Sequence, residues 1–176
     1  MSRRRHRART GVRVYARIAA VTGMSACQSP AANMAVNPPL VIGADTLTAE
    51  EVREYLRIAI GFTSQGGRVY CSYAFAGQDP RAAYVLALCE ELVPAPGDSL
   101  VAGSATRRPI ALYVQRAGGA RTLAHRSTRD GDMFSSDLRS IFSPQALTQL
   151  RAIHRAWSDV APQLERANRE AAVRRF

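Results

Sequence analysis

The sequence predicts an α+β domain in which one helix packs on a curved, four-stranded antiparallel meander and a second helix follows the sheet. Three observations predict this. Apolar residues recur at helical spacing within 48–60, alternate or run continuously between turn signals through 68–127, and return to helical spacing after residue 143. A helix, a run of strands and a further helix is an α+β order, not an alternating βαβ order.

The first helix begins at a capping box. Thr48 is the expected N-cap and Glu51 occupies the third helical position, so each side chain is able to bond the other residue's backbone N–H. Gly61 is a suitable terminator. The predicted core-facing side of this helix consists of Val52, Tyr55, Leu56, Ala59 and Ile60.

Four strands are expected between this helix and residue 128. Segment 68–75 alternates in polarity, 83–93 is rich in Val, Leu and Tyr, 100–115 is long, and 121–127 closes the meander. Turn residues separate them at 77–80, 94–98 and 118–119. Pro109 predicts a bend in the third strand, because proline has no N–H for the ladder.

The last helix begins at Ser143, the expected N-cap, with Pro144 at the first helical position. Pro162 predicts a break or kink, and an Arg-rich, frayed tail follows over 161–176. A helix laid on a curved meander is the cystatin-like or NTF2-like roll, whose concave sheet face is able to bind a ligand or partner. The apolar stripe of the last helix is Leu147, Leu150, Ile153 and Trp157.

The front of the chain resembles a bacterial lipoprotein signal peptide. Seven arginines and no acid occupy residues 1–26, the apolar segment 14–26 is too short to span a bilayer, and small residues precede Cys27. We therefore expect 1–26 to be a signal peptide, Cys27 to carry the lipid (palmitate or a similar acyl chain), and the protein to be anchored to the cell membrane outside the cytoplasm. Secretion without an anchor is one alternative, and a basic leader on a cytoplasmic protein is another.

The remaining 150 residues are enough for one domain. Residues 27–46, with Pro30, Pro38 and Pro39, predict a flexible tether, and 47–160 the single domain. Seven of the 24 basic residues lie in the leader, which leaves 17 Arg against 14 acids, a net charge of +3. Nucleic-acid binding is therefore disfavoured, and it stays an alternative only if the leader is retained.

Cys71 and Cys89 predict a disulfide. Their midpoint is residue 80, inside the turn at 77–80, so a hairpin centred there places the two cysteines directly opposite each other. Export would supply the oxidising surroundings that such a bond needs. Two buried free thiols are the alternative.

No catalytic, cofactor or metal motif is recognisable. Ser72 or Ser104 with His125 and Asp130 could supply a triad, but nothing in their spacing marks a nucleophile elbow or an oxyanion hole. Structural roles at the sheet are the favoured interpretation, and no catalytic residue and no cofactor are assigned.

Two sets of acidic residues and one set of arginines are further candidates for a binding site. Asp130, Asp132 and Asp137 lack the further oxygen ligands of a calcium loop, so no metal is assigned. Glu90 and Glu91 are adjacent on a strand and would face opposite ways. The tail arginines could contact anionic lipid headgroups, against a default of solvated side chains; they are Arg166, Arg169, Arg174 and Arg175.

Residues 84–144 resemble a family of uncharacterised bacterial secreted and lipid-anchored domains. The resemblance is carried by Tyr84-Val85-Leu86-Ala87-Leu88-Cys89-Glu90-Glu91, Gly103-Ser104, Pro109, Arg129-Asp130-Gly131, Phe134, Asp137-Leu138 and Ile141-Phe142. Two positions depart from the family pattern: Ala105 stands where Gly is usual, and Ser143 separates Phe142 from Pro144. The resemblance implies an exported α+β domain and carries no reaction.

The function expected from these features is that of an envelope accessory domain that binds a protein or a small ligand by its sheet face. An enzyme of the NTF2-like kind, with a polar residue deep in the concavity, is the second class. Nucleic-acid binding is the third. The expected partners are therefore the membrane, through the lipid on Cys27, and an unidentified envelope protein or small ligand.

Overall fold

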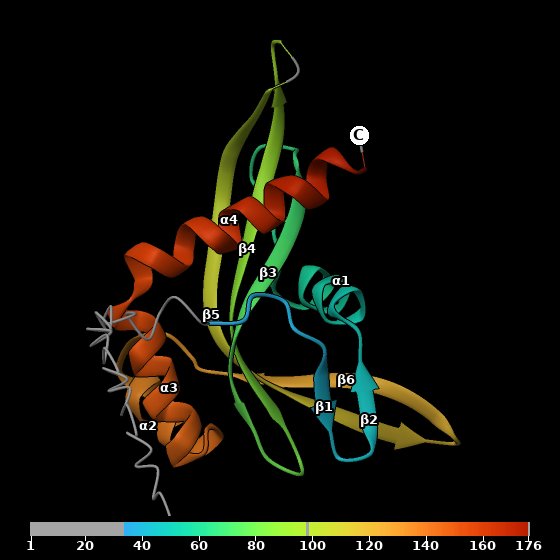
Figure 1. Ribbon diagram of the computed structural model, residues 1–176, viewed down its shortest axis with the longest axis vertical. Helices are drawn as coiled ribbons and strands as arrows, with labels where there is room; N and C mark the ends of the chain where they lie inside the picture. The colour runs from blue at the N-terminus through green and yellow to red at the C-terminus, as the bar shows by residue number, and fades with distance from the viewer. Residues whose placement is uncertain (1–33, 98, 176) are drawn as a thin grey trace, which may run out of the picture.

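The computed structural model describes residues 34–97 and 99–175, and it has the predicted α+β architecture. Four antiparallel strands form a meander in the order β3-β4-β5-β6, as Figure 1 shows. Cys27 and the expected signal peptide lie outside the described residues. The elements are β1 (Leu40–Ile42), β2 (Asp45–Leu47), α1 (Ala49–Ile60), β3 (Arg68–Gln78), β4 (Ala83–Ala95), β5 (Ser99–Ala117), β6 (Ala120–Ser127), η2 (Gly131–Met133), α2 (Phe134–Ile141), α3 (Pro144–Arg155) and α4 (Trp157–Val173).

The β3–β4 register confirms the predicted hairpin. Cys71 stands opposite Cys89, with their Cα atoms 4.1 Å apart, and the two form a disulfide. The same register continues to Phe75 opposite Val85, and it then shifts at a bulge before Gly77. Gly77 has a φ of 127°, a conformation that favours glycine, so the bulge sits where the sequence tolerates it.

The capping box of α1 is complete. The Glu51 backbone N–H donates to the Thr48 hydroxyl over 3.2 Å, and the Thr48 backbone N–H donates to the Glu51 carboxylate over 2.7 Å. Val52 and Leu56 are fully buried against the sheet, as the apolar spacing predicts. The helix thus starts and packs where its sequence indicates.

Residues 34–46, expected to belong to a flexible tether, pack on the domain instead, and the part of the expected tether before residue 34 lies outside the described residues. Strands β1 and β2 pair as a small hairpin whose Leu40, Ile42 and Leu47 are buried. Before them, the backbone of Asn37 bonds that of Tyr73, and the Tyr73 hydroxyl donates to the Pro38 carbonyl. The hairpin is not predicted from the sequence, because its strands have three residues each and two prolines stand just before them.

Strand β5 continues through Pro109. Pro109 pairs with Leu86 of β4 on one side, whereas β6 pairs with β5 only from Ile110 onward. The proline therefore lies one residue outside the three-strand part of the sheet, where its missing N–H interrupts no ladder with β6. Beyond it, β5 and β6 extend as a long hairpin away from the rest of the sheet (Figure 1).

The C-terminal region differs most from prediction. The helix is interrupted at Ala156, not at Pro162, and α4 then continues through Pro162 to Val173. Pro162 removes only the bond to the Ser158 carbonyl, and Ser158 is exposed to water. The prediction of a frayed tail over 161–176 is wrong up to Val173, where α4 ends. Within this part of the helix, Leu164, Asn168 and Ala172 are buried on the sheet.

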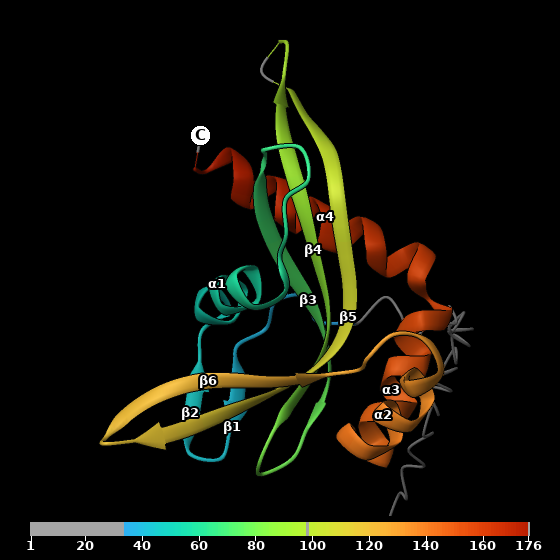
Figure 2. The ribbon, with the colours of Figure 1, turned by 180° about the vertical axis from the view of Figure 1, so that it is seen from behind.

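The sheet has two covered faces. One carries α1 and the β1–β2 hairpin over a core that includes Tyr73, Val85 and the disulfide. The other carries α3 and α4 over a second core, and α4 runs diagonally across it (Figures 1 and 2). Among the described helices, none is both long and apolar enough to cross a membrane.

Candidate functional site

The residues considered for a Ser–His–Asp triad lie apart and have other partners. The Ser72 hydroxyl is buried under α4 and donates to the Leu164 carbonyl over 2.9 Å. Ser104 donates to the Glu91 carboxylate over 2.9 Å. Asp130 forms an ion pair with Arg108 at 2.8 Å. The structure therefore does not bring these groups together.

His125 faces α1 instead of an acid. Its Nδ1 lies 2.8 Å from the Tyr55 hydroxyl, and the two rings meet edge to face with centroids 5.8 Å apart. Partial burial lowers the pKa of His125 below its ordinary 6.5. The hydrogen bond between the Tyr55 hydroxyl and His125 Nδ1 joins β6 to α1.

The three aspartates considered for calcium also separate. Asp137 accepts from the Arg129 guanidinium at 2.9 and 2.8 Å and from the Arg129 backbone N–H at 2.8 Å. These bonds lower the pKa of Asp137 to about 2. Within 34–97 and 99–175, no three His, Cys, Asp or Glu side chains gather at a metal-sized spacing.

Glu90 and Glu91 face opposite sides of β4, as strand alternation predicts. Glu91 is fully buried and accepts the backbone N–H groups of Ser64, Gln65, Gly67 and Ser104 over 2.8–3.2 Å. These donors, the Ser64 N–H foremost, hold the pKa of Glu91 far below its ordinary 4.5. Glu91 of β4 thus holds the loop 61–67 against the sheet and bonds the neighbouring strand β5 at Ser104.

Two glycines make room for that carboxylate. A Cβ at Gly103 would lie 2.8 Å from a Glu91 carboxylate oxygen, and one at Gly67 would lie 2.6 Å from the Leu92 carbonyl and 2.8 Å from the Glu91 Cγ. Real Cβ atoms do not approach so closely. The backbone N–H donors of this cluster are therefore all occupied by the Glu91 carboxylate, and the cluster leaves no space for an external ligand.

Glu90 has a sparser setting. It is almost buried beneath α4 and accepts from the Asn168 Nδ2 over 2.7 Å. The Asn168 Oδ1 and the nearby Tyr70 hydroxyl are buried without a partner among the described residues. The Asn168 side chain lies in the packed layer beneath α4, whereas Tyr70 also lines the cavity between α1, β3 and the end of α4. We assign neither group a ligand.

Among the cavities of the described residues, the one with the most apolar wall lies between α2, α3 and the β4–β5 part of the sheet. We call it the α2–α3 hollow. It measures about 570 Å³, within the range of about 300–1,000 Å³ typical of small-molecule pockets. It is lined by six apolar residues, Leu86, Pro109, Phe134, Leu138, Leu147 and Leu150, and by Arg107, Ser135, Arg139, Arg151, His154 and Arg155.

The elements around the α2–α3 hollow contribute an apolar wall and a set of cationic side chains. Leu86 of β4 and Leu150 of α3 are buried and belong to the main core, so they form a firm apolar wall. Phe134, at the start of α2, is 40 % exposed at the margin. Arg139 and Arg155 stand in the last turns of α2 and α3, where the helix dipole favours a positive charge.

Arg107 is held in place by an aromatic ring. Its guanidinium carbon lies 4.6 Å from the centre of the Trp157 ring, a cation–π contact. Trp157 itself is half-buried at the start of α4, not enclosed between helix and sheet as its apolar stripe suggests. The contact joins β5 to the junction of α3 and α4.

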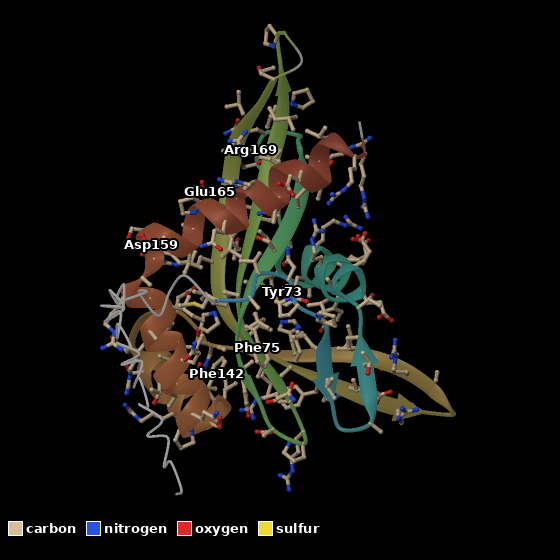
Figure 3. The ribbon with its side chains drawn as sticks, viewed as in Figure 1. Tyr73, Phe75, Phe142, Asp159, Glu165 and Arg169 are labelled. Carbon is tan, nitrogen blue, oxygen red and sulfur yellow. A yellow bond between two sulfur atoms is a disulfide. The ribbon has the colours of Figure 1, made fainter. Side chains whose placement is uncertain are left out.

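The tail arginines do not form one free patch. Arg175 pairs with Glu50 and with Glu54 on α1, and Arg169 donates to the Leu100 carbonyl over 2.9 Å. Figure 3 shows Asp159, Glu165 and Arg169 along α4, and all three are exposed. The outer face of α4 is thus of mixed charge, which lessens its attraction for an anionic surface.

The α2–α3 hollow was not predicted from the sequence. One signal for it exists: Leu147, Leu150, Arg151, His154 and Arg155 follow helical spacing on one side of α3. The short helix α2 was missed as well, although Phe134, Leu138, Ile141 and Phe142 have the same kind of spacing.

Comparison with known proteins adds no relationship. A scan against protein-family models, a search of curated proteins and a search of solved structures each gave no match.

Proposed function

We propose that this chain is an accessory domain of the bacterial envelope, exported and anchored by lipid at Cys27, that binds a small ligand in the α2–α3 hollow. The single observation that supports binding is the hollow itself, a concave apolar site with polar groups at its margin. From the sequence, the ligand is expected on an open sheet face. Helices α3 and α4 pack on the sheet, so we place the ligand in the hollow between α2, α3 and the sheet.

Export is supported by the disulfide and by the order of the leader residues. Disulfides persist in oxidising compartments and are rare in the cytoplasm of most organisms. Anchoring to the membrane at Cys27, with the domain outside the cytoplasm, is the form of export we propose, and secretion is the alternative.

The address is tested by labelling. In a bacterial host with lipoprotein machinery, the wild-type chain is expected to take up labelled palmitate and to fractionate with membranes, whereas Cys27→Ser is expected to do neither. Wild-type protein that keeps its leader and takes up no label would contradict the anchor.

Binding is tested separately with a neutral fluorescent probe, N-phenyl-1-naphthylamine, on the full chain carrying Cys27→Ser so that no attached lipid competes. The probe is expected to brighten on binding, and Leu147→Trp, which fills the hollow, is expected to abolish the response. Ile58→Trp is the matched control, because Ile58 is 71 % exposed on α1, over the opposite face. Equal brightening in both variants would exclude the hollow.

An enzyme has less support than a binding domain. An NTF2-like enzyme needs an ionisable or polar group deep in the cavity. The described residues that line the hollow include no carboxylate, and His154 is exposed at its margin. Nucleic-acid binding depends on a retained leader, which lies outside the described residues.

A further inference from the structure

We propose, resting on the proposed function, that the ligand of the α2–α3 hollow is an anionic amphiphile. Its acyl chain would lie on the leucine-lined wall. Its carboxylate or phosphate head would be bound by the arginine cluster, which consists of Arg107, Arg139, Arg151 and Arg155.

The first argument is the charge of the lining. Of the described residues, four arginines and one histidine face the hollow, and no Asp or Glu does. None of the four arginine side chains forms an ion pair or a hydrogen bond with another described residue, whereas seven arginines elsewhere in the described structure pair with carboxylates. The hollow therefore gathers four arginine side chains without a carboxylate partner in one concave site, where their charge is complementary to an anion.

The second argument is the arrangement along α3. Leu147 and Leu150 come first on the face toward the hollow, and Arg151 and Arg155 follow one turn apart. Like charges at this spacing repel each other. A bound anion would relieve that repulsion, while the leucines would cover its chain. The helix thus presents an apolar surface and a cationic surface in the order that an amphiphile requires.

The third argument is the geometry of the binding groups. A guanidinium offers a planar fork of donors that fits both oxygens of a carboxylate or two oxygens of a phosphate. The Trp157 ring positions the Arg107 guanidinium before any ligand arrives. Phosphate and carboxylate heads share this recognition, and the experiment below distinguishes them.

The chain's own leader is a poor occupant. The apolar segment 14–26 contains Arg17 and follows a run of arginines with no acid. Placing it against four arginines would bring like charges together. Charge complementarity therefore favours an external anion over this segment.

The test is displacement of the neutral probe from the full chain carrying Cys27→Ser, with amphiphiles that differ only in head group. Decanoate and decyl phosphate are expected to displace it at concentrations at least tenfold lower than decanol or decylamine. Each additional buried methylene is expected to strengthen binding about fourfold until the hollow is filled. The ratio of decanoate to decyl phosphate identifies the preferred head, and inorganic phosphate alone is expected to displace nothing.

The arginines are tested with charge-removing variants. Arg151→Gln and Arg155→Gln are each expected to weaken decanoate about tenfold and to leave decanol unchanged, since a hydrogen bond to a charged group contributes about that factor. Arg166→Gln is the matched control. It removes an exposed arginine of α4 that forms no ion pair within the described part of the chain and does not line the hollow.

The outcomes separate the two proposals. If decanol equals decanoate and the glutamine variants change nothing, the anionic head is wrong, while ligand binding in the hollow stands. If decylamine binds best, the charge argument is reversed and the inference is overturned. If the probe itself never binds, the proposed function fails.

Discussion

The two faces of the sheet are built by different means. The face under α1 is fastened at many points: the disulfide, the Glu91 cluster, the Tyr55–His125 pair and the β1–β2 hairpin all lie on it. The face under α3 and α4 is held mainly by apolar packing, and it leaves the α2–α3 hollow at one end. The cavity between α1, β3 and the end of α4 is smaller, about 220 Å³, and charged side chains form most of its lining. The α2–α3 hollow is larger and has an apolar wall.

Adjacent residues of β4 show the contrast most closely. Glu91, on the α1 face, accepts four backbone N–H groups and the Ser64 and Ser104 hydroxyls. Glu90, on the α4 face, accepts from Asn168 alone among the described residues. The two carboxylates are chemically equal, so the difference between them belongs to the surroundings.

The largest loss of folding stability is therefore expected from Glu91→Gln. An amide cannot accept from all these donors, and its NH₂ group faces N–H groups left without an acceptor in a buried place. We expect loss of cooperative folding, or a large fall in unfolding temperature, measured by circular dichroism. Glu90→Gln is the matched control on the same strand, with a small change expected. Equal effects would contradict the contrast.

The same carboxylate predicts a pH dependence. Because the pKa of Glu91 is lowered in the folded state, its ionised form stabilises the fold fully above its ordinary value of 4.5, and that stabilisation is lost as the pH falls below it. Asp137, whose pKa is about 2, acts in the same direction. Thermal unfolding from pH 7 to pH 3 should show a steep loss below about pH 4.5, and unchanged stability there would contradict the assignment.

The second largest effect is expected from Leu164→Ala on the α4 face. Leu164 is fully buried, so the substitution should cost roughly 2–5 kcal/mol in unfolding free energy. Arg166→Ala, on the exposed side of the same helix, should change it by no more than about 0.5 kcal/mol. Urea unfolding of both variants measures the difference. Equal stability would mean that α4 does not dock as described.

A smaller effect is expected from removing the disulfide with Cys71→Ser and Cys89→Ser together. The bond closes a loop with a sequence separation of 18, so its loss should cost about 3 kcal/mol in the chain-entropy model. Non-reducing alkylation and mass spectrometry of the exported wild-type protein should find both cysteines blocked. Two alkylated cysteines in that protein would contradict the bond and weaken the case for export.

The smallest effect is expected at His125. Burial lowers the pKa of His125, so the unfolded chain takes up a proton more readily, and stability declines as the pH falls below 6.5. His125→Gln should remove this slope, whereas His154→Gln, at an exposed position, should leave it unchanged. A slope that persists in His125→Gln would assign it to another group.

Prediction from sequence succeeds where the determinants are local. The capping box fixes the start of α1, and the symmetry of Cys71 and Cys89 about residue 80 gives the β3–β4 register up to Phe75. The bulge at Gly77 shifts the pairs beyond it, and no local rule places that shift. The prediction of a helix break at Pro162 is wrong, because the break is at Ala156. Pro162 removes only a backbone hydrogen bond to the Ser158 carbonyl, and Ser158 is exposed to water.

The candidate site could not be predicted in the same way. The hollow exists because β4, β5, α2 and α3 converge from separate parts of the sequence, and Arg107 joins Arg151 only in the folded chain. Glu91 likewise acquires its donors from the loop 61–67 and from β5. Sequence patterns report which residues face a core, but not where packing leaves a space.

The measurement that tests the central claim most directly is a methyl NMR titration of the full chain carrying Cys27→Ser with decanoate. Leucines of the hollow, Leu138, Leu147 and Leu150, should shift with increasing ligand, while those of the α1 face, Leu40, Leu47 and Leu56, should stay unchanged. Shifts confined to the α1 face, or no shift in either set, would contradict the assignment of the α2–α3 hollow as the binding site.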